Sequence, residues 1–116
     1  MSSVNIRMKG KSSKSIDKLS DILQSKINAE LVAESKRSYD DANVVLLSFE
    51  KYFMRNGSYA SLTVLLTENE KKQTADIIGS GGGEGIFNIS WGANSDFAEM
   101  AEKVLSKYGF KREWLK

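Results

Sequence analysis

The stretch NVVLLSFEKYFMR-NG-SYASLTVLLT (43–67) decides the fold, because two apolar runs flank a turn signal. Asn56-Gly57 is typical of a tight β-hairpin, since both central residues of a type I′ turn need a positive φ. A two-residue turn there predicts a register in which Phe49 opposes Val64. One face of the hairpin is then apolar except for Lys51, and we expect it to be the core. Its members are Val45, Leu47, Phe49, Phe53, Ala60, Leu62, Val64 and Leu66.

The opposite face of this hairpin is more polar, but it carries more apolar side chains than we expect of a face exposed only to solvent. We predict that it forms an interface through Leu46, Tyr52, Met54, Tyr59 and Leu65. A homodimer is the simplest partner, because a two-fold contact uses the same patch twice. The alternative is that the C-terminal tail (110–116) covers this face with Phe110 and Trp114 and leaves a monomer.

The segments before the hairpin predict a strand and a helix. Alternating apolar residues predict a strand over 4–9, and Ser13 or Ser15 can cap the helix that follows. The apolar stripe of that helix is Ile16, Leu19, Leu23 and Ile27, widened by Ile22. Residues 30–39 fit either a helical extension or a strand, and we predict a strand.

The segments after the hairpin predict two further strands, at 73–78 and 86–91, and a final helix. Residues 92–95 are expected to end the second strand and cap the helix, and Gly109 to stop it. The apolar stripe of the final helix is Phe97, Met100, Ala101, Val104, Leu105 and Tyr108. Strands in sequence with few helices are typical of an antiparallel sheet covered on one side. The prediction is therefore one α+β domain over 1–116, a two-layer sandwich of about five antiparallel strands with two helices on one face.

The most unusual segment is the glycine-rich loop 79–85, GSGGGEG, which we expect to be neither regular strand nor helix. Consecutive backbone N–H groups can line an anion site, and a small anionic ligand would there meet Ser80, Gly81, Gly82, Gly83, Glu84, Asn88 and Ser90. The spacings of the phosphate-binding P-loop and of the dinucleotide-binding fingerprint are both absent, and the segment after the loop is strand-like. A wide structural hairpin loop is the alternative.

The residue inventory limits the chemistry. The chain has 116 residues with neither histidine nor cysteine, which excludes catalytic triads, thiolate nucleophiles and the commonest metal ligands. We therefore expect no metal, no cofactor and no catalytic residue, and an enzyme is disfavoured. The absence of cysteine, of a signal peptide and of a long apolar run favours a cytoplasmic protein without membrane contact.

Both ends of the chain are basic, although the net charge is only +2. Residues 1–27 carry a local charge of +4, from six basic residues against Asp17 and Asp21. Lysine and arginine also dominate 107–116. Because no aromatic residues interleave with the N-terminal charges, we interpret them as solvated surface and disfavour nucleic acid as a partner.

Two segments resemble a family of short bacterial proteins of unknown function. One is IGSGGGEGIFNISWGANSDF (78–97), with its glycine-loop-to-tryptophan run, and the other is the hairpin FEKYFMRNGS (49–58). The resemblance covers most of the chain and implies a complete domain, but no activity. The function predicted from the residues is a non-catalytic, self-associating binding domain. The alternative is a small-molecule or anion binder, or an enzyme, that uses the glycine-rich loop.

Overall fold

The chain folds into a sheet and two helices in a computed structural model that describes residues 2–53, 57–81 and 88–113. The elements in chain order are β1 (Ser2–Gly10), α1 (Ile16–Lys26), β2 (Glu30–Ser38), β3 (Asn43–Phe53), β4 (Ser58–Glu68), β5 (Gln73–Gly81), α2 (Asn88–Ser106) and β6 (Lys111–Arg112). The predicted α+β class is confirmed, and so is the strand character of the ambiguous segment at 30–39.

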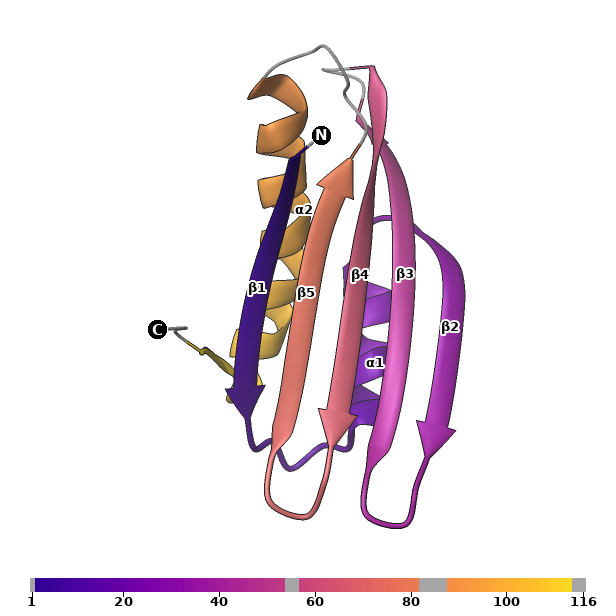
Figure 1. Cartoon of the computed structure of the whole chain (residues 1–116), viewed down its shortest axis with the longest axis vertical. Coiled ribbons are helices and arrows are strands. Elements are labelled where there is room, and N and C mark those ends of the chain that lie inside the picture. Colours follow the sequence, from indigo (N-terminus) through magenta and orange to yellow (C-terminus); the bar gives the residue numbers. More distant parts are fainter. Residues whose placement is uncertain (1, 54–56, 82–87, 114–116) are drawn as a thin grey trace.

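The described strands form one six-stranded sheet in the order β2-β3-β4-β5-β1-β6, and every neighbouring pair is antiparallel. Strands β2 to β5 follow one another as a meander, whereas β1 pairs with β5 and α1 carries the chain across the sheet to β2 (Figure 1). The prediction of about five strands was wrong by one. The two-residue strand β6 extends the sheet beyond β1.

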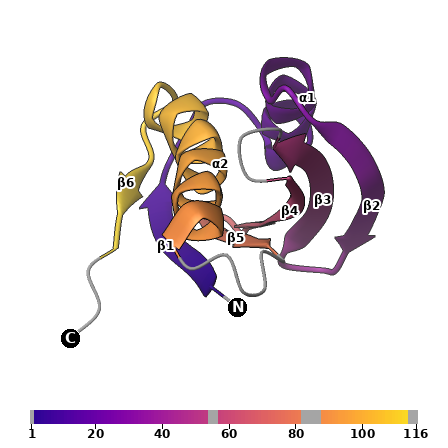
Figure 2. The same cartoon turned by 90° about the horizontal axis from the view of Figure 1, so that it is seen from above.

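Both helices lie on the same side of the curved sheet (Figure 2). The sheet residues that face this side are buried, as the alternation of the central hairpin predicted. Of the predicted core face, Val45, Leu47, Phe49, Ala60, Leu62, Val64 and Leu66 are each no more than 3% exposed. The side chain of Phe53 lies outside the described residues. Ile16, Leu19 and Leu23 of α1 and Phe97, Ala101 and Leu105 of α2 complete this core.

The predicted hairpin register was wrong by two residues. Phe49 opposes Leu62 rather than Val64, and the last pair is Phe53 with Ser58. The connection is therefore the four residues 54–57 and not a two-residue turn at Asn56-Gly57, although Gly57 does have a positive φ of 66°. A shift of two residues keeps each side chain on its face, which is why the core face was still predicted correctly.

The glycine-rich segment and its surroundings also differ from the prediction. Gly79, Ser80 and Gly81 belong to β5 and pair with β1 and β4 on both sides. The expected strand at 86–91 and its end at 92–95 are wrong, because α2 already begins at Asn88. Burial between two flanking strands overrides the low strand propensity of these glycines.

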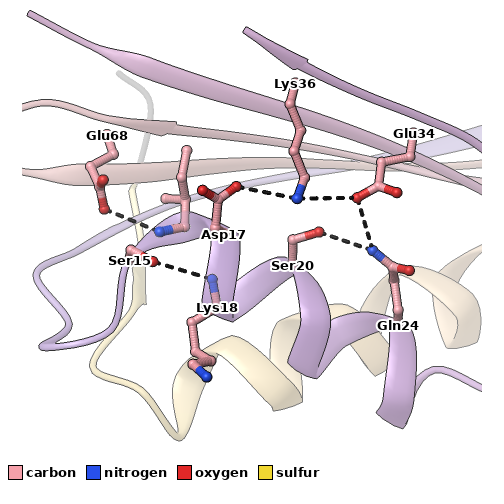
Figure 3. Close-up of polar contacts among 9 residues, drawn as sticks. Ser15, Asp17, Lys18, Ser20, Gln24, Glu34, Lys36 and Glu68 are labelled. Atoms are coloured by element: carbon pink, nitrogen blue, oxygen red, sulfur yellow. Dashed lines mark hydrogen bonds and ion pairs between the residues drawn. The ribbon is translucent and has the colours of Figure 1, made fainter. Parts of the chain in front are cut away.

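Polar contacts connect the start of α1 to the end of β4 and the start of β5. Ser15 is the N-cap, accepting from the Lys18 N–H, and Glu68 accepts from the Ile16 N–H at 3.1 Å (Figure 3). The side chain of Gln73, only 5% exposed, accepts from the Ser12 N–H at 2.7 Å. Its amide donates to the Lys14 carbonyl and to Glu68, both at 2.8 Å. Gln73 thus holds the chain between β1 and α1.

The end of α2 is fixed by a left-handed glycine, as predicted. Gly109 has a φ of 90°, and the Phe110 N–H donates to the Leu105 carbonyl, which closes the helix in a Schellman motif. Gly10 at the end of β1 lies against this turn, so closely that a Cβ would stand 2.8 Å from the Gly109 carbonyl oxygen. This close approach places β6 beside β1.

The first testable prediction concerns the core face. Phe49→Ala should lower the free energy of unfolding by about 3–5 kcal/mol, because it removes a large, fully buried side chain. Tyr59→Ala, at a side chain that is 60% exposed, serves as the control and should change it by less than about 1 kcal/mol. Urea denaturation measures both, and equal stabilities would contradict this account of the core.

The second prediction concerns Gln73. Gln73→Leu should cost about 1–3 kcal/mol, because the Ser12 N–H and the Lys14 carbonyl lose their partner in a part-buried site. Amide hydrogen exchange at Ser12 should become faster. Lys72→Leu places the same side chain on the exposed neighbour and should leave both measurements unchanged. Unchanged protection of Ser12 in the Gln73 variant would show that Gln73 is not the anchor.

Candidate functional site

The sheet face turned away from the helices is covered by none of the described elements (Figure 2), and we call it the open face. It consists of the side chains that alternate with the buried ones on β3, β4, β5 and β1, together with the β2 residues that pair with open-face residues of β3, such as Arg37 opposite Val44. Its described members on the three central strands are Val44, Leu46, Ser48, Glu50, Tyr52, Tyr59, Ser61, Thr63, Leu65, Thr67, Thr74, Asp76, Ile78 and Ser80.

The predicted interface residues on this face form two cross-strand pairs. Leu46 lies directly opposite Leu65, and Tyr52 lies opposite Tyr59. The two tyrosine rings contact each other with their centroids 5.0 Å apart and their planes tilted by 60°. Leu46 and the two tyrosines are between 38% and 60% exposed, so the pairs face solvent.

The two pairs are not adjacent, although the predicted register led us to expect one group. Leu46 and Tyr52 are six residues apart, roughly 20 Å along a strand that rises about 3.3 Å per residue. Two rows of polar side chains, Ser48 with Thr63 and Glu50 with Ser61, separate them. Met54 lies outside the described residues.

Two apolar residues that we did not assign to the interface join the leucine pair. Val44 is the next open-face residue along β3 from Leu46, and Ile78 lies opposite Thr63 on β5. Ile78 is 39% exposed. The alternation of 73–78 could have revealed it, because Ala75 and Ile77 are buried on the other face. Leu46, Leu65, Val44 and Ile78 form what we call the apolar patch.

Several polar side chains of the open face bond to one another or to neighbouring strands. Ser61 and Ser80 share a hydrogen bond of 2.8 Å between their hydroxyl oxygens, and the hydroxyls of Thr67 and Thr74 bond to each other in the same way. Asp76 pairs with Arg7 of β1 at 3.1 Å. These contacts leave a hydroxyl-rich surface around the apolar patch, with Arg37 of β2 directly opposite Val44 at its border.

The residues predicted to hold an anion are not brought together in the part of the chain that the structure describes. Ser80 and Gly81 are in β5, and the hydroxyl of Ser80 lies on the open face beside Ser61. The backbone of Asn88 and Ser90 forms the first turn of α2, on the other side of the sheet (Figure 2). Their side chains, and the whole of Gly82, Gly83 and Glu84, lie outside the described residues.

A helix follows the glycine-rich segment, which removes one of the arguments made against a phosphate-binding motif. We had expected a strand there, and both familiar motifs require a helix. The glycine spacings still do not fit either motif. The glycine-rich loop as a ligand site therefore stays a prediction.

The free edge of the sheet at β2 has features that oppose pairing with another strand. A β-bulge shifts the register between Leu31 and Ala33. Lys36 and Glu34 point toward the helix side, where Lys36 lies 3.4 Å from Asp17, and Glu34 accepts from Gln24 at 3.2 Å (Figure 3). The hydrogen bond and charge of Asp17 raise the pKa of Lys36, so it stays protonated. Bulges and inward-pointing charges are how edge strands avoid aggregation.

The tail offers no cover for the open face as far as it is described. Phe110, which we had considered as part of such a cover, is 2% exposed and packs in the core on the helix side. Glu113 donates its N–H to the Arg7 carbonyl at the edge of β1. Trp114 lies beyond the described residues.

A hollow of about 280 Å³ lies between the β2–β3 and β4–β5 turns, beside Asp40, Asp41 and Glu70.

Among the described residues, no three acidic side chains gather in a way that could hold a metal ion. None of the described helices is long and apolar enough to cross a membrane.

Comparison with known proteins shows the family of this chain. The model of the family of unknown function DUF6054 matches residues 1–109, and the chain belongs to that family. Neither the curated proteins nor the solved structures contain a match.

Proposed function

We propose that this DUF6054 domain is a non-catalytic interaction module that self-associates through its open face. The single observation that carries the proposal is the apolar patch, with Leu46 directly opposite Leu65 on a face that no described element covers. Scattered exposed apolar residues need no explanation, but a contiguous group on a sheet face is typical of an interaction site.

The surroundings of the apolar patch favour a protein partner. Ser, Thr and apolar side chains make up the centre of the face. Two charged residues directly oppose members of the patch: Asp76, which is paired with Arg7, and Arg37, which lies opposite Val44 at the β2 border. Interface cores are depleted in charged residues and enriched in tyrosine, which the Tyr52–Tyr59 pair supplies at one end.

A second copy of this chain is the partner that we favour. The four side chains of the apolar patch carry no charge, so a second copy can meet them without placing like charges against one another there. A two-fold axis then doubles every contact. The two longest dimensions of the molecule are 45 and 32 Å. A stable dimer takes roughly 800 Å² from each partner, so the hydroxyl-rich surroundings of the apolar patch would contribute to the interface as well. The bulge and inward charges of β2 argue against association through that edge.

This proposal predicts the effect of charge on the apolar patch. The double variant Leu46→Glu and Leu65→Glu should weaken dimerisation at least about 100-fold, because two carboxylates would be buried without partners. Light scattering over a concentration series measures the dissociation constant. Both positions are on the sheet surface, so circular dichroism should show an intact fold.

The matched control adds the same charge on the other side of the molecule. Ser13→Glu and Ser25→Glu are exposed positions before and within α1, and this variant should dimerise like the unmodified chain. A monomer at millimolar concentration for the unmodified chain would refute self-association. Equal weakening in both variants would place the interface elsewhere.

A further inference from the structure

The two basic ends of the chain, which are far apart in sequence, lie side by side in the fold. Strand β6 pairs with the end of β1, so that Lys9 is directly opposite Lys111 and Met8 is opposite Arg112. Met8 is buried on the helix side, where Arg112 pairs with Glu102 of α2. Lys9 and Lys111 therefore point to the open face.

These two lysines form an unusual pair. Like charges directly opposite each other on neighbouring strands are destabilising. Among the described residues neither Lys9 nor Lys111 has an ion pair, whereas the arginines next to them, Arg7 and Arg112, are both paired with carboxylates. The row continues across the sheet with the hydroxyls of Thr74 and Thr67, since Lys9 opposes Thr74 and Thr74 opposes Thr67.

Further lysines lie at the same end of the molecule. Lys11 follows the end of β1, and Lys72 precedes the start of β5. Both line one hollow of about 130 Å³. Glu68, Glu70 and Lys71 also line this hollow. Neither Lys11 nor Lys72 has an ion pair within the described part of the chain. We call Lys9, Lys11, Lys72 and Lys111 the lysine row.

We propose that the lysine row binds the phosphate backbone of a nucleic-acid duplex, with Lys9 and Lys111 as the central contacts. The proposal does not depend on self-association. The absence of aromatic residues among the N-terminal charges had disfavoured nucleic acid. Pairing of β1 with β6, however, brings together positive charge that the sequence divides between its two ends. Ammonium groups without ion pairs suit an extended polyanion, because phosphate contacts require charge and not an enclosing pocket.

The other polyanions fit this surface less well. The large exposed apolar side chains of the described residues are Val32, Tyr39, Leu46, Tyr52, Tyr59 and Ile78, and none lies in the lysine row. Stable attachment to a lipid surface usually combines basic residues with buried apolar ones. Unpaired bases usually stack on aromatic side chains, and the described row contains none, which favours a duplex over a single strand.

The test is the salt dependence of binding to a 20-base-pair DNA duplex of mixed sequence, followed by fluorescence anisotropy. If four lysines each neutralise one phosphate, the plot of log K against log salt concentration should have a slope near about −3.6. The variant Lys9→Gln with Lys111→Gln should reduce the magnitude of this slope by about 2. Its melting temperature should not fall, since the substitution removes a like-charge contact.

The matched control is Lys18→Gln with Lys26→Gln, which removes the same charge from exposed positions on α1 and should leave the slope unchanged. Equal reductions in both variants would overturn the proposal, because net charge alone would explain binding. The absence of measurable binding at low salt would overturn it too. So would stronger, Lys9-dependent binding to vesicles with phosphatidylserine, or displacement by inorganic phosphate beyond that by chloride at equal ionic strength.

Discussion

Alternate side chains of β3 and β4 are buried against the two helices, and the positions of the other elements depend on this burial. Phe49, opposite Leu62, lies at the centre of the buried face, and both are almost fully inaccessible to solvent. Because strand side chains alternate strictly, burying this set exposes the intervening one. The core and the apolar patch of the open face are thus two consequences of one alternation.

Pairing of β1 with β5 makes the two ends of the open face different. Inserting β1 beside β5 buries Ile6 and Met8 on the helix side and leaves Arg7 and Lys9 on the open face. The close contact of Gly10 with the turn at Gly109 then places β6 along β1. One end of the open face is therefore basic, while its centre is apolar and rich in hydroxyl groups.

Local patterns predicted the elements with strong periodicity and failed where neighbouring strands decide the conformation. The helical stripes of α1 and α2 were visible because their apolar residues repeat every three or four positions. The end of α2 was visible because a glycine at that position is itself a local stop signal. Gly79 and Gly81 have little strand propensity of their own, yet pairing with β1 and β4 holds them in β5. The start of α2 was missed for a related reason, since apolar residues near 86–91 fit either a strand or a buried helical turn.

The sequence by itself determined which side chains face the core and which face outward in the central hairpin, because that choice needs only a period of two. It also excluded every chemistry that needs a histidine or cysteine side chain, because the chain contains neither. Only the tertiary structure decided which outward residues are neighbours. A register shift of two leaves every face unchanged but changes the cross-strand partners, so that Leu46 lies opposite Leu65 and Tyr52 opposite Tyr59. Long-range pairing alone brings Lys9 to Lys111.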